Sequence, residues 1–359
     1  MSETQARKAD HVRIVSEKDV EGGRSGFECV RFVHRALPEI DRKDIETTAC
    51  VLGKKLEMPL IINAMTGGYP GAARINRALA KVAQEHGIGF GLGSMRAMVE
   101  DESVLRTYAV RDLAPDVLLV GNIGLPQLTS FEFAPIMDAM EKVGVDAVAV
   151  HLNPLHESTQ PEGETAYARG LAAIREFMSQ SRWPIIVKET GAGISMDVAR
   201  SLESAGVEWV DVGGLGGTSF AAVESYRATD PVGRMLADSL RDWGIPTAAS
   251  LVEVVCSTTL NVIASGGIRS GLDAAKSISL GARCVGVASP FLRALRRGKR
   301  EVDRYVRLFH SQMVASMFLT GSKSLDELRD ASLVLSGWLR DWLTDRGADP
   351  SRFSRRGRS

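Results

Sequence analysis

The chain alternates short apolar runs with longer segments whose apolar residues recur at helical spacing. Each apolar run ends in a glycine or a small polar residue, as strands do before a turn. We predict strands at 59–65, 89–93, 117–122, 147–152, 185–188, 209–212, 260–264 and 284–288. We predict helices that begin near residue 71 and that span about 101–111, 128–143, 165–178, 196–205, 272–280 and 291–297.

Parallel strands that alternate with helices form either an open sheet or a closed barrel. Eight units with polar residues at nearly every strand end favour closure, so the predicted fold class is α/β, a single (β/α)8 TIM barrel. No linker divides the chain, and residues 1–359 are expected to form one domain. We expect an N-terminal extension at 1–57, a longer insertion at 219–249, and a C-terminal helical tail that is disordered at 345–359.

The composition narrows the class of protein. Lysine plus arginine and aspartate plus glutamate both number 44, so no basic field for nucleic acid is expected. The first ten residues lack the apolar core of a signal peptide, and no apolar run is long enough to span a bilayer. The four cysteines form no CxxC pair, which indicates neither a zinc site nor a redox pair. These observations favour a cytoplasmic enzyme without a membrane partner.

A glycine-rich turn follows the seventh predicted strand, in the run Ser265-Gly266-Gly267-Ile268-Arg269. The eighth strand ends in Ala288-Ser289 before another helix. Glycines let backbone N–H groups approach an anion, and a helix N-terminus turns its positive end towards it. Because the last two strand ends of such barrels usually hold a phosphate, the sequence predicts a phosphorylated cofactor.

Polar side chains stand at most of the strand ends, and they include no pair of nucleophile and base. Single members have structural explanations, since Asn122 could fix a turn and Thr218 could cap a helix. Basic residues at the second and fifth strands make a shared anion-binding site the better interpretation of the whole set. Its members are Thr66, Ser94, Arg96, Asn122, His151, Asn153, Lys188, Thr218 and Arg269.

Lys188 ends an apolar strand, where a lysine needs an anionic partner or must lose its charge. It could form a Schiff base, or it could lie beside an electron-rich cofactor ring. The glycine-rich run 213–217 favours the ring, because a flat ring close to the backbone needs glycines. FMN fits both the ring and the phosphate cradle, so we expect FMN.

The segment 151–163 contains two histidines and two glutamates, but their spacing matches no common zinc pattern. Glu162 would suit Mg²⁺ if substrate phosphates supplied other ligands, and an exposed, solvated loop is the alternative. Arg7 and Lys8, with His11 nearby, could fold over an anionic substrate. On physical grounds alone, a solvated and frayed N-terminus is the better interpretation of that segment.

Together these motifs resemble the type II, FMN-dependent isopentenyl-diphosphate isomerase family over roughly residues 5 to 320. The Gly-Gly-Ile-Arg cradle is shared with many FMN barrels, whereas the Arg-Lys pair with the Gln-Pro-Glu-Gly loop is more specific. Met95 and His156 depart from the family pattern, which has glutamine there. The matching segments are Arg7-Lys8-Ala9-Asp10-His11, Met65-Thr66-Gly67-Gly68, Gly93-Ser94-Met95-Arg96-Ala97, Gly121-Asn122-Ile123-Gly124, His151-Leu152-Asn153, Gln160-Pro161-Glu162-Gly163, Val187-Lys188-Glu189, Gly216-Gly217-Thr218-Ser219 and Ser265-Gly266-Gly267-Ile268-Arg269.

The resemblance implies that the enzyme interconverts isopentenyl and dimethylallyl diphosphate by a 1,3-proton shift, with NADPH needed only to reduce FMN. It implies catalytic roles for Gln160 and Lys188, Mg²⁺ at Glu162, a substrate contribution from the extension 1–57, and a homo-oligomer such as a tetramer or octamer. The implied substrate residues are Arg7, Lys8, His11, Ser94, Arg96, His151, Asn153 and Gln160. The implied FMN residues are Ala64, Met65, Thr66, Ser94, Asn122, Lys188, Thr218, Gly266, Gly267, Arg269, Ala288 and Ser289.

Other functions remain open at this point. A redox FMN barrel is the main alternative, either a 2-hydroxyacid oxidase or a dihydroorotate-type dehydrogenase. The oxidases need a histidine base near the later strands, and no histidine occurs between His156 and His310. An inosinate-dehydrogenase-like enzyme would need a cysteine after the sixth strand, and Cys256 lies well beyond it. A non-catalytic flavin-binding protein would not need Arg7, Lys8, Gln160 and Glu162.

Overall fold

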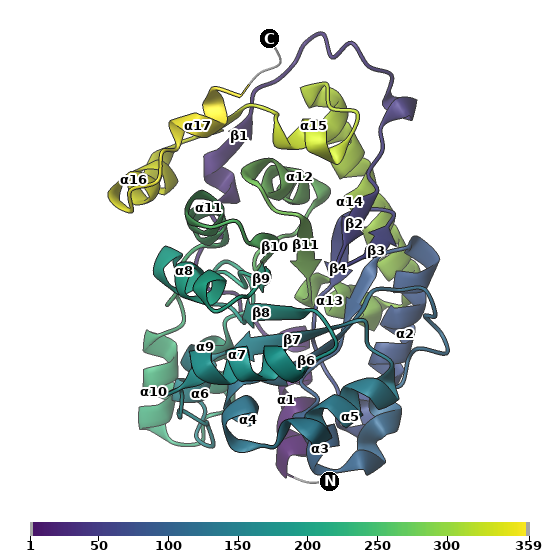
Figure 1. Ribbon diagram of the computed structural model, residues 1–359, viewed down its shortest axis with the longest axis vertical. Coiled ribbons are helices and arrows are strands. Elements are labelled where there is room, and N and C mark those ends of the chain that lie inside the picture. Colours follow the sequence, from purple (N-terminus) through teal and green to yellow (C-terminus); the bar gives the residue numbers. More distant parts are fainter. Residues whose placement is uncertain (1–2, 357–359) are drawn as a thin grey trace.

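Eight parallel strands form a closed barrel in this computed structural model, which describes residues 3–356 (Figure 1). The strands follow one another around the barrel in chain order, and β11 pairs with β4 to close it, with Val285 opposite Leu60. The predicted (β/α)8 barrel is confirmed, and each predicted strand range overlaps an observed strand. The strands are β4 (Leu60–Ile62), β5 (Gly89–Gly91), β6 (Leu119–Gly124), β7 (Ala147–Leu152), β8 (Ile185–Glu189), β9 (Trp209–Asp211), β10 (Asn261–Ser265) and β11 (Cys284–Val287).

Helices cover the outside of the barrel, and most lie close to the predicted ranges. They are α2 (Pro70–His86), α3 (Arg96–Glu100), α4 (Leu125–Ser130), α5 (Phe133–Val143), α7 (Gly170–Gln180), α8 (Met196–Ser204), α11 (Thr247–Ser257), α12 (Gly271–Leu280) and α13 (Ser289–Arg297). The single helix predicted at 128–143 is wrong, because Phe131 and Glu132 are extended and separate α4 from α5. Most of the helix predicted at 101–111 is instead a 3-10 helix, η3 (Glu102–Thr107), capped by the Asp101 side chain.

Three further helices lie in segments that were expected to be loops or an insertion. The short helix α6 (Pro154–Thr159) follows β7, and the insertion after β9 forms α9 (Phe220–Arg227) and α10 (Pro231–Ser239). The helices α6 and α9 pack against each other, and α10 packs on α9. This packing brings the loop after β7 next to the insertion after β9.

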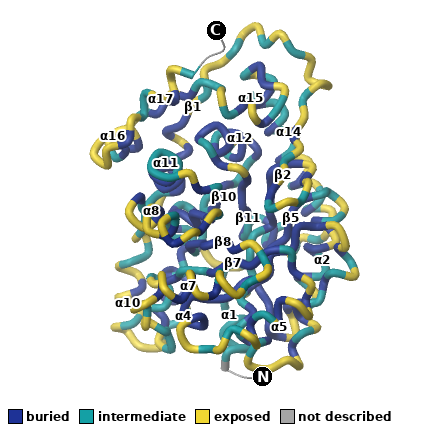
Figure 2. The backbone as a smooth tube through the Cα atoms, viewed as in Figure 1, coloured by how far each residue is buried: buried dark blue, intermediate teal, exposed yellow. Residues whose placement is uncertain are grey.

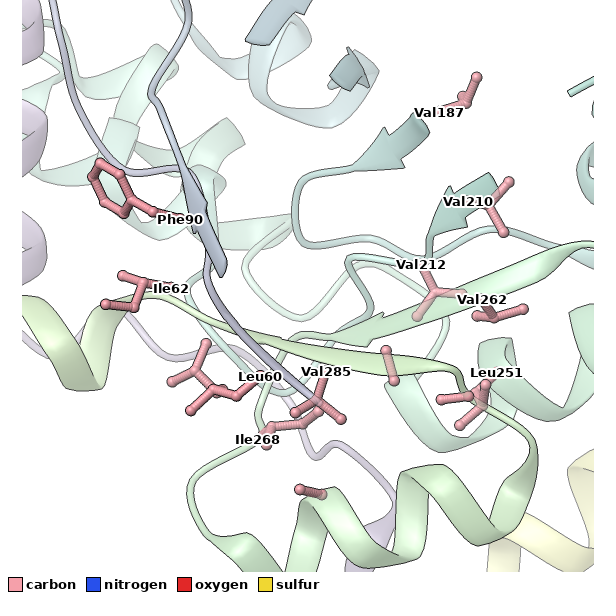
Figure 3. Packing of buried hydrophobic residues seen from close by; sticks show 14 of the residues in the cluster. Leu60, Ile62, Phe90, Val187, Val210, Val212, Leu251, Val262, Ile268 and Val285 are labelled. Atoms are coloured by element: carbon pink, nitrogen blue, oxygen red, sulfur yellow. The ribbon is translucent and has the colours of Figure 1, made fainter. Parts of the chain in front are cut away.

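Alternation along the barrel strands separates two groups of apolar side chains. Leu60, Ile62 and Phe90 belong to the main cluster, which also includes buried helix residues (Figure 3). Ile61 belongs to a second cluster of buried residues inside the barrel. A hairpin of β2 (Ala49–Val51) and β3 (Lys54–Leu56) adds Val51 and Leu56 to that inner cluster and so closes the N-terminal end of the barrel. The opposite, C-terminal end stays open for a site, and Figure 2 shows the barrel strands buried beneath the more exposed outer helices.

The two ends of the chain add elements outside the barrel. The helix α1 (Glu3–Glu17) contacts α9 and α13. After the 3-10 helix η1 (Phe27–Cys29), β1 (Val30–Phe32) pairs antiparallel with β12 (Leu333–Leu335), and η2 (Arg42–Asp44) precedes the hairpin. The C-terminal part forms α14 (Lys299–Thr320), α15 (Leu325–Arg329), α16 (Gly337–Asp345) and α17 (Ser351–Ser354). Figure 1 places α15, α16 and α17 at the end of the molecule away from α1.

The expected disorder at 345–359 is wrong for the part of this tail that the structure describes, which ends at residue 356. Phe353 is fully buried in the main core cluster. The Arg356 guanidinium donates to the carbonyl oxygens of Ser279 (2.6 Å) and Arg329 (2.8 Å), so backbone acceptors on α12 and α15 hold the tail. The sequence did not predict this ordered tail, because Phe353 is a single apolar residue among basic ones. Among the described helices, none is long and apolar enough to cross a membrane.

Candidate active site

A cavity of about 270 Å³ opens at the C-terminal ends of the barrel strands. It collects nearly every residue that the sequence singled out, from the N-terminal helix to the last strand. The predicted residues that line it are Arg7, Lys8, His11, Ala64, Met65, Thr66, Ser94, Arg96, Asn122, His151, Asn153, Gln160, Lys188, Thr218, Gly266, Gly267, Arg269, Ala288 and Ser289. Glu162 is the exception and lies outside the lining.

The N-terminal arm, which consists of α1 and the residues after it up to Gly22, is not frayed. The helix α1 lies over the cavity, and Lys8 points into it. The Lys8 ammonium donates to the Ser94 carbonyl oxygen (2.8 Å) and to the Tyr108 hydroxyl (3.2 Å). Burial lowers the pKa of Lys8 to about 7, and the positive charge of neighbouring Arg7 contributes to this shift. The expectation of a solvated N-terminus is therefore wrong, and the arm contributes cationic groups to the cavity.

Lys188 has the anionic partner that its position required. Its ammonium lies 3.6 Å from a carboxylate oxygen of Asp211, and both side chains are buried. The Asn63 amide donates to the same carboxylate at 2.9 Å and fixes its orientation. Sequence analysis missed Asp211, although a carboxylate at the end of the apolar strand β9 carries the same signal as Lys188 on β8. The two strands are neighbours, with Lys188 directly opposite Asp211 in the register.

The glycine-rich turns after β9 and β10 pack directly against each other at the cavity wall, where a side chain would clash with the facing backbone. A Cβ at Gly217 would lie 2.7 Å from the Gly267 nitrogen, and one at Gly266 would lie 2.0 Å from the Gly214 oxygen. Gly266 also has a φ of +98°, which disfavours any side chain. The N-terminus of α13 begins at Ser289 on the same side of the cavity. These residues fit a flavin phosphate, because backbone N–H groups and a helix N-terminus converge there.

Arg269 reaches this cradle with a counter-ion already in place. Its guanidinium lies 2.8 Å from a carboxylate oxygen of Glu21, and Arg293 lies 3.1 Å from the same oxygen. The backbone of the arm holds Glu21 there, since residue 21 bridges to Thr218 and the Gly22 N–H donates to the Gly217 oxygen. Sequence analysis did not identify Glu21, which no motif marks.

On the opposite side of the barrel, at β6 and β7, His151 and Asn122 share a hydrogen bond of 2.9 Å. Burial lowers the pKa of His151 to about 3, and the positive charges of Lys188 and Lys8 act in the same direction. The imidazole is therefore neutral at physiological pH. Asn153 donates to Glu157 (2.6 Å) and accepts from Tyr167 (2.9 Å), so its side chain is held in place.

Glu162 lies at the rim of the cavity in an ion-pair network. Its carboxylate accepts from Arg227 at 2.7 Å and lies 3.8 Å from Arg7. Burial disfavours its charge, but the hydrogen bond from Arg227, a backbone hydrogen bond and the positive charges of Arg227 and Arg7 together outweigh burial and lower the pKa of Glu162. An ionised carboxylate is the hard oxygen donor that Mg²⁺ prefers, so Glu162 fits a magnesium ligand although Arg227 holds it here.

Three ligand-type side chains meet beside this network. The Nε2 atoms of His11 and His156 lie 2.7 Å and 2.9 Å from the same carboxylate oxygen of Glu224. Glu224 is fully buried, and Arg227 pairs with its second oxygen at 2.5 Å. Sequence analysis missed Glu224 and Arg227, because a glutamate and an arginine three residues apart on a helix are typical of an exposed ion pair.

The fold and the cavity define a class of protein, the FMN-dependent α/β barrels, and comparison with known proteins agrees. The model of the FMN-dependent dehydrogenase family matches residues 13–109 and 133–335. Among solved structures, an arginine-to-lysine mutant of flavocytochrome b2 is similar with a TM-score of 0.66 at 18% identity, covering 95% of this chain and 88% of that one. A chimera of (S)-mandelate dehydrogenase is similar with a TM-score of 0.65 at 19% identity, covering 92% of this chain and 99% of that one. At these identities the solved structures show the fold alone.

Curated relatives are much more similar. An isopentenyl-diphosphate delta-isomerase of Pyrococcus horikoshii is 46% identical over 350 residues, covering 95% of this chain and 94% of that protein. An isopentenyl-diphosphate delta-isomerase of Methanothermobacter thermautotrophicus is 46% identical over 352 residues, covering 98% of this chain and 99% of that protein. The chain therefore belongs to the type II, FMN-dependent isopentenyl-diphosphate delta-isomerase family, as the sequence motifs had suggested.

Proposed function

We propose that this protein converts isopentenyl diphosphate to dimethylallyl diphosphate in isoprenoid biosynthesis, by a 1,3-allylic proton shift that uses reduced FMN and Mg²⁺. One observation supports the proposal: the cavity has two regions, on opposite sides, whose lining groups suit anions. The glycine cradle at β10 and β11 suits a cofactor phosphate. The cationic groups Arg7, Lys8 and Arg96 near β5–β7 suit a second phosphorylated molecule.

The second region would bind the diphosphate of the substrate. Lys8 and Arg96 offer N–H donors there, and Ser94, His151 and Asn153 add polar side chains. Arg96 is paired with Glu100 and Glu164, each at 2.7 Å, which fixes its guanidinium before a ligand arrives. An anchored diphosphate lets remote binding energy position the carbon skeleton over the centre of the barrel.

The first region would hold FMN, with Gly266, Gly267, Arg269, Ala288 and Ser289 around its phosphate and Ala64, Met65, Thr66, Asn122 and Thr218 near the rest. When bound and reduced, FMN supplies the acid and base that the strand ends lack. Lys188 would place its positive charge at the anionic edge of the ring, and Asp211 would fix the position of that ammonium. Buried Gln160 would lie beside the reacting carbons, where its amide orients the substrate.

Glu162 would bind Mg²⁺ together with the diphosphate oxygens. In this arrangement Arg227 has to give up its 2.7 Å contact with Glu162, and the fully buried Glu224 remains as its partner at 2.5 Å. NADPH would be needed only as the reductant of FMN. A homo-oligomer, such as a tetramer or octamer, and a cytoplasmic location stay predictions; the exposed apolar residues Val232 and Met235 on α10 support the oligomer.

An anaerobic assay tests the proposal. Purified protein with FMN, Mg²⁺ and isopentenyl diphosphate should form dimethylallyl diphosphate only after reduction by NADPH, and without stoichiometric consumption of NADPH. The variant Gln160→Ala should keep FMN and lose turnover. Gln84→Ala, a surface variant on α2, is the matched control and should behave as wild type. A yellow protein without product would refute the proposal and favour a redox FMN barrel.

A further inference from the structure

The three side chains described beside Glu162 come from separate parts of the chain. We call them the histidine–glutamate cluster: His11 on α1, His156 on α6 and Glu224 on α9. One ligand atom from each lies within 4.8 Å of the other two. We propose that the histidine–glutamate cluster binds a transition-metal dication of the zinc type, separate from Mg²⁺ at Glu162, with its open position towards the cavity.

The donor set suits such an ion. Two imidazole nitrogens and one carboxylate oxygen make the set that many catalytic zinc sites use, with a water or a ligand oxygen in the fourth position. Imidazole ligands favour zinc, cobalt or nickel over Mg²⁺ and Ca²⁺, which prefer oxygen.

The geometry needs only small movements. Both Nε2 atoms already point at one carboxylate oxygen, at 2.7 Å and 2.9 Å. Ligand atoms of a tetrahedral zinc ion lie about 3.3 Å apart, so each side chain would retreat by about half an ångström. In the structure the two imidazoles share hydrogen bonds with that oxygen. An ion between them would replace these bonds, and each neutral ring would then carry its proton on Nδ1.

The residues around the cluster favour an ion that binds tightly, and they leave one coordination position open. Arg227 holds the second Glu224 oxygen, which orients the carboxylate but adds a repelling positive charge. The positive charge of Arg227 disfavours cations that bind weakly, so only ions with a high affinity for imidazole would bind at the cluster. Phe220 stacks on His156 at 4.4 Å and excludes water from one face. His11 and His156 both line the cavity, so the fourth position would accept a water or an anionic oxygen.

Charge also favours such an ion when an anion fills the cavity. Within the network, Glu162 and Glu224 balance Arg7 and Arg227, so a dication adds two positive charges at the cavity wall. A phosphate or carboxylate ligand in the cavity would compensate for them. Because the cluster joins α1 to α6 and α9, a bound ion would also hold the N-terminal helix against the barrel.

Equilibrium dialysis of the full-length holoprotein against Zn²⁺ or Co²⁺, with excess Mg²⁺ present, tests this inference without an activity assay. Wild type should bind about one ion per chain, and Co²⁺ should give the visible absorption of a four-coordinate site. His11→Gln, His156→Gln and Glu224→Gln should each weaken binding by at least about tenfold. His310→Gln, which removes a distant histidine, and Glu162→Gln should retain the ion.

Two results would overturn the inference. Wild type could bind neither ion in the presence of Mg²⁺, which would leave the cluster as a hydrogen-bonded network. Alternatively, Glu162→Gln could remove the ion while His156→Gln retains it, which would assign the ion to Glu162. Circular dichroism of each variant separates loss of binding from loss of fold. The isomerase proposal stands or falls on its own assay, because this one measures metal content alone.

Discussion

The carboxylate of Glu21 should weaken the binding of FMN in the wild type. The variant Glu21→Gln should therefore bind FMN more tightly. The Glu21 carboxylate oxygen lies 2.8 Å from the Arg269 guanidinium, the side chain that would meet the cofactor phosphate. Residue 21 itself lies outside the cavity lining, so it has no contact of its own to offer the cofactor. Its negative charge therefore acts on the phosphate only by repulsion and by sharing Arg269.

The size of the effect follows from Coulomb's law. A phosphate on the far side of the guanidinium would lie about 7 Å from Glu21, where two unit charges repel by about 0.6 to 2.4 kcal/mol for dielectric constants of 80 to 20. The Glu21 and Arg269 side chains are 36% and 34% exposed, so solvent screening favours the lower part of this range. We expect about 1 kcal/mol, or about fivefold tighter binding.

Titration of the apoprotein with FMN, followed by quenching of flavin fluorescence, measures this difference. Glu17→Gln is the matched control, because Glu17 pairs with Arg296 at 3.4 Å and not with the cradle. The gain should shrink as salt is raised, since screening weakens the repulsion. Weaker binding of FMN by Glu21→Gln would refute the reasoning and show that Glu21 is needed to position Arg269.

Three further predictions concern other parts of the molecule. The pKa of Lys8 is lowered to about 7, so its ammonium is present below that pH and is lost above it. In the wild type, kcat/KM should therefore fall as the pH rises through 7. A pH–rate profile of Lys8→Arg that shows the same fall would contradict this prediction. Gly266→Ala should abolish FMN retention on purification, because its Cβ would lie 2.0 Å from the Gly214 oxygen, whereas Gly298→Ala, also at positive φ but with no atom within 4 Å, should retain FMN. Glu253→Gln should lower the free energy of unfolding in urea by about 2 kcal/mol, because the buried carboxylate accepts from Met196 N–H and Trp342 Nε1. Asp197→Asn, which removes an exposed partner of Arg346, should change it by less than about 1 kcal/mol.

The barrel could be predicted from the sequence because its signal is local. Each strand is a short apolar run with a glycine or small polar residue at its end, and a helix follows within a few residues. The hairpin that closes the barrel could not be predicted in this way. Val51 lies in the short apolar run Ala49-Cys50-Val51-Leu52, and Leu56 stands between Lys55 and Glu57. Only contacts with the inner cluster show that these two residues are core. Phe353 in the C-terminal tail was missed for the same reason.

The residues of the candidate site also fall into those with a local signal in the sequence and those that only tertiary contacts reveal. Side chains at strand ends were found because the topology brings all eight ends together, whatever the spacing in sequence. Asp211 could have been found by the same argument, since it ends β9 as Lys188 lies near the end of β8. Glu21, Glu224 and Arg227 lie on an arm and on an inserted helix, where position in sequence does not define position in space. Their roles depend on tertiary packing alone.

Most of the candidate anion-binding cations share one further property: a carboxylate partner is already in place. Lys8 is the exception, because its ammonium donates to the Ser94 carbonyl oxygen and the Tyr108 hydroxyl. Arg269 is paired with Glu21, Lys188 with Asp211, and Arg96 with Glu100 and Glu164. A buried cation without a partner would be costly and would lose its proton or its position. In this arrangement an incoming anion finds cations that are charged and oriented, and it shares or exchanges a partner instead of meeting an unpaired charge. The equal numbers of acidic and basic residues, 44 each, fit a protein whose anion sites are balanced from within. Selectivity for phosphorylated ligands would then depend on where the pairs lie in the cavity, since the chain as a whole carries no excess charge to attract them.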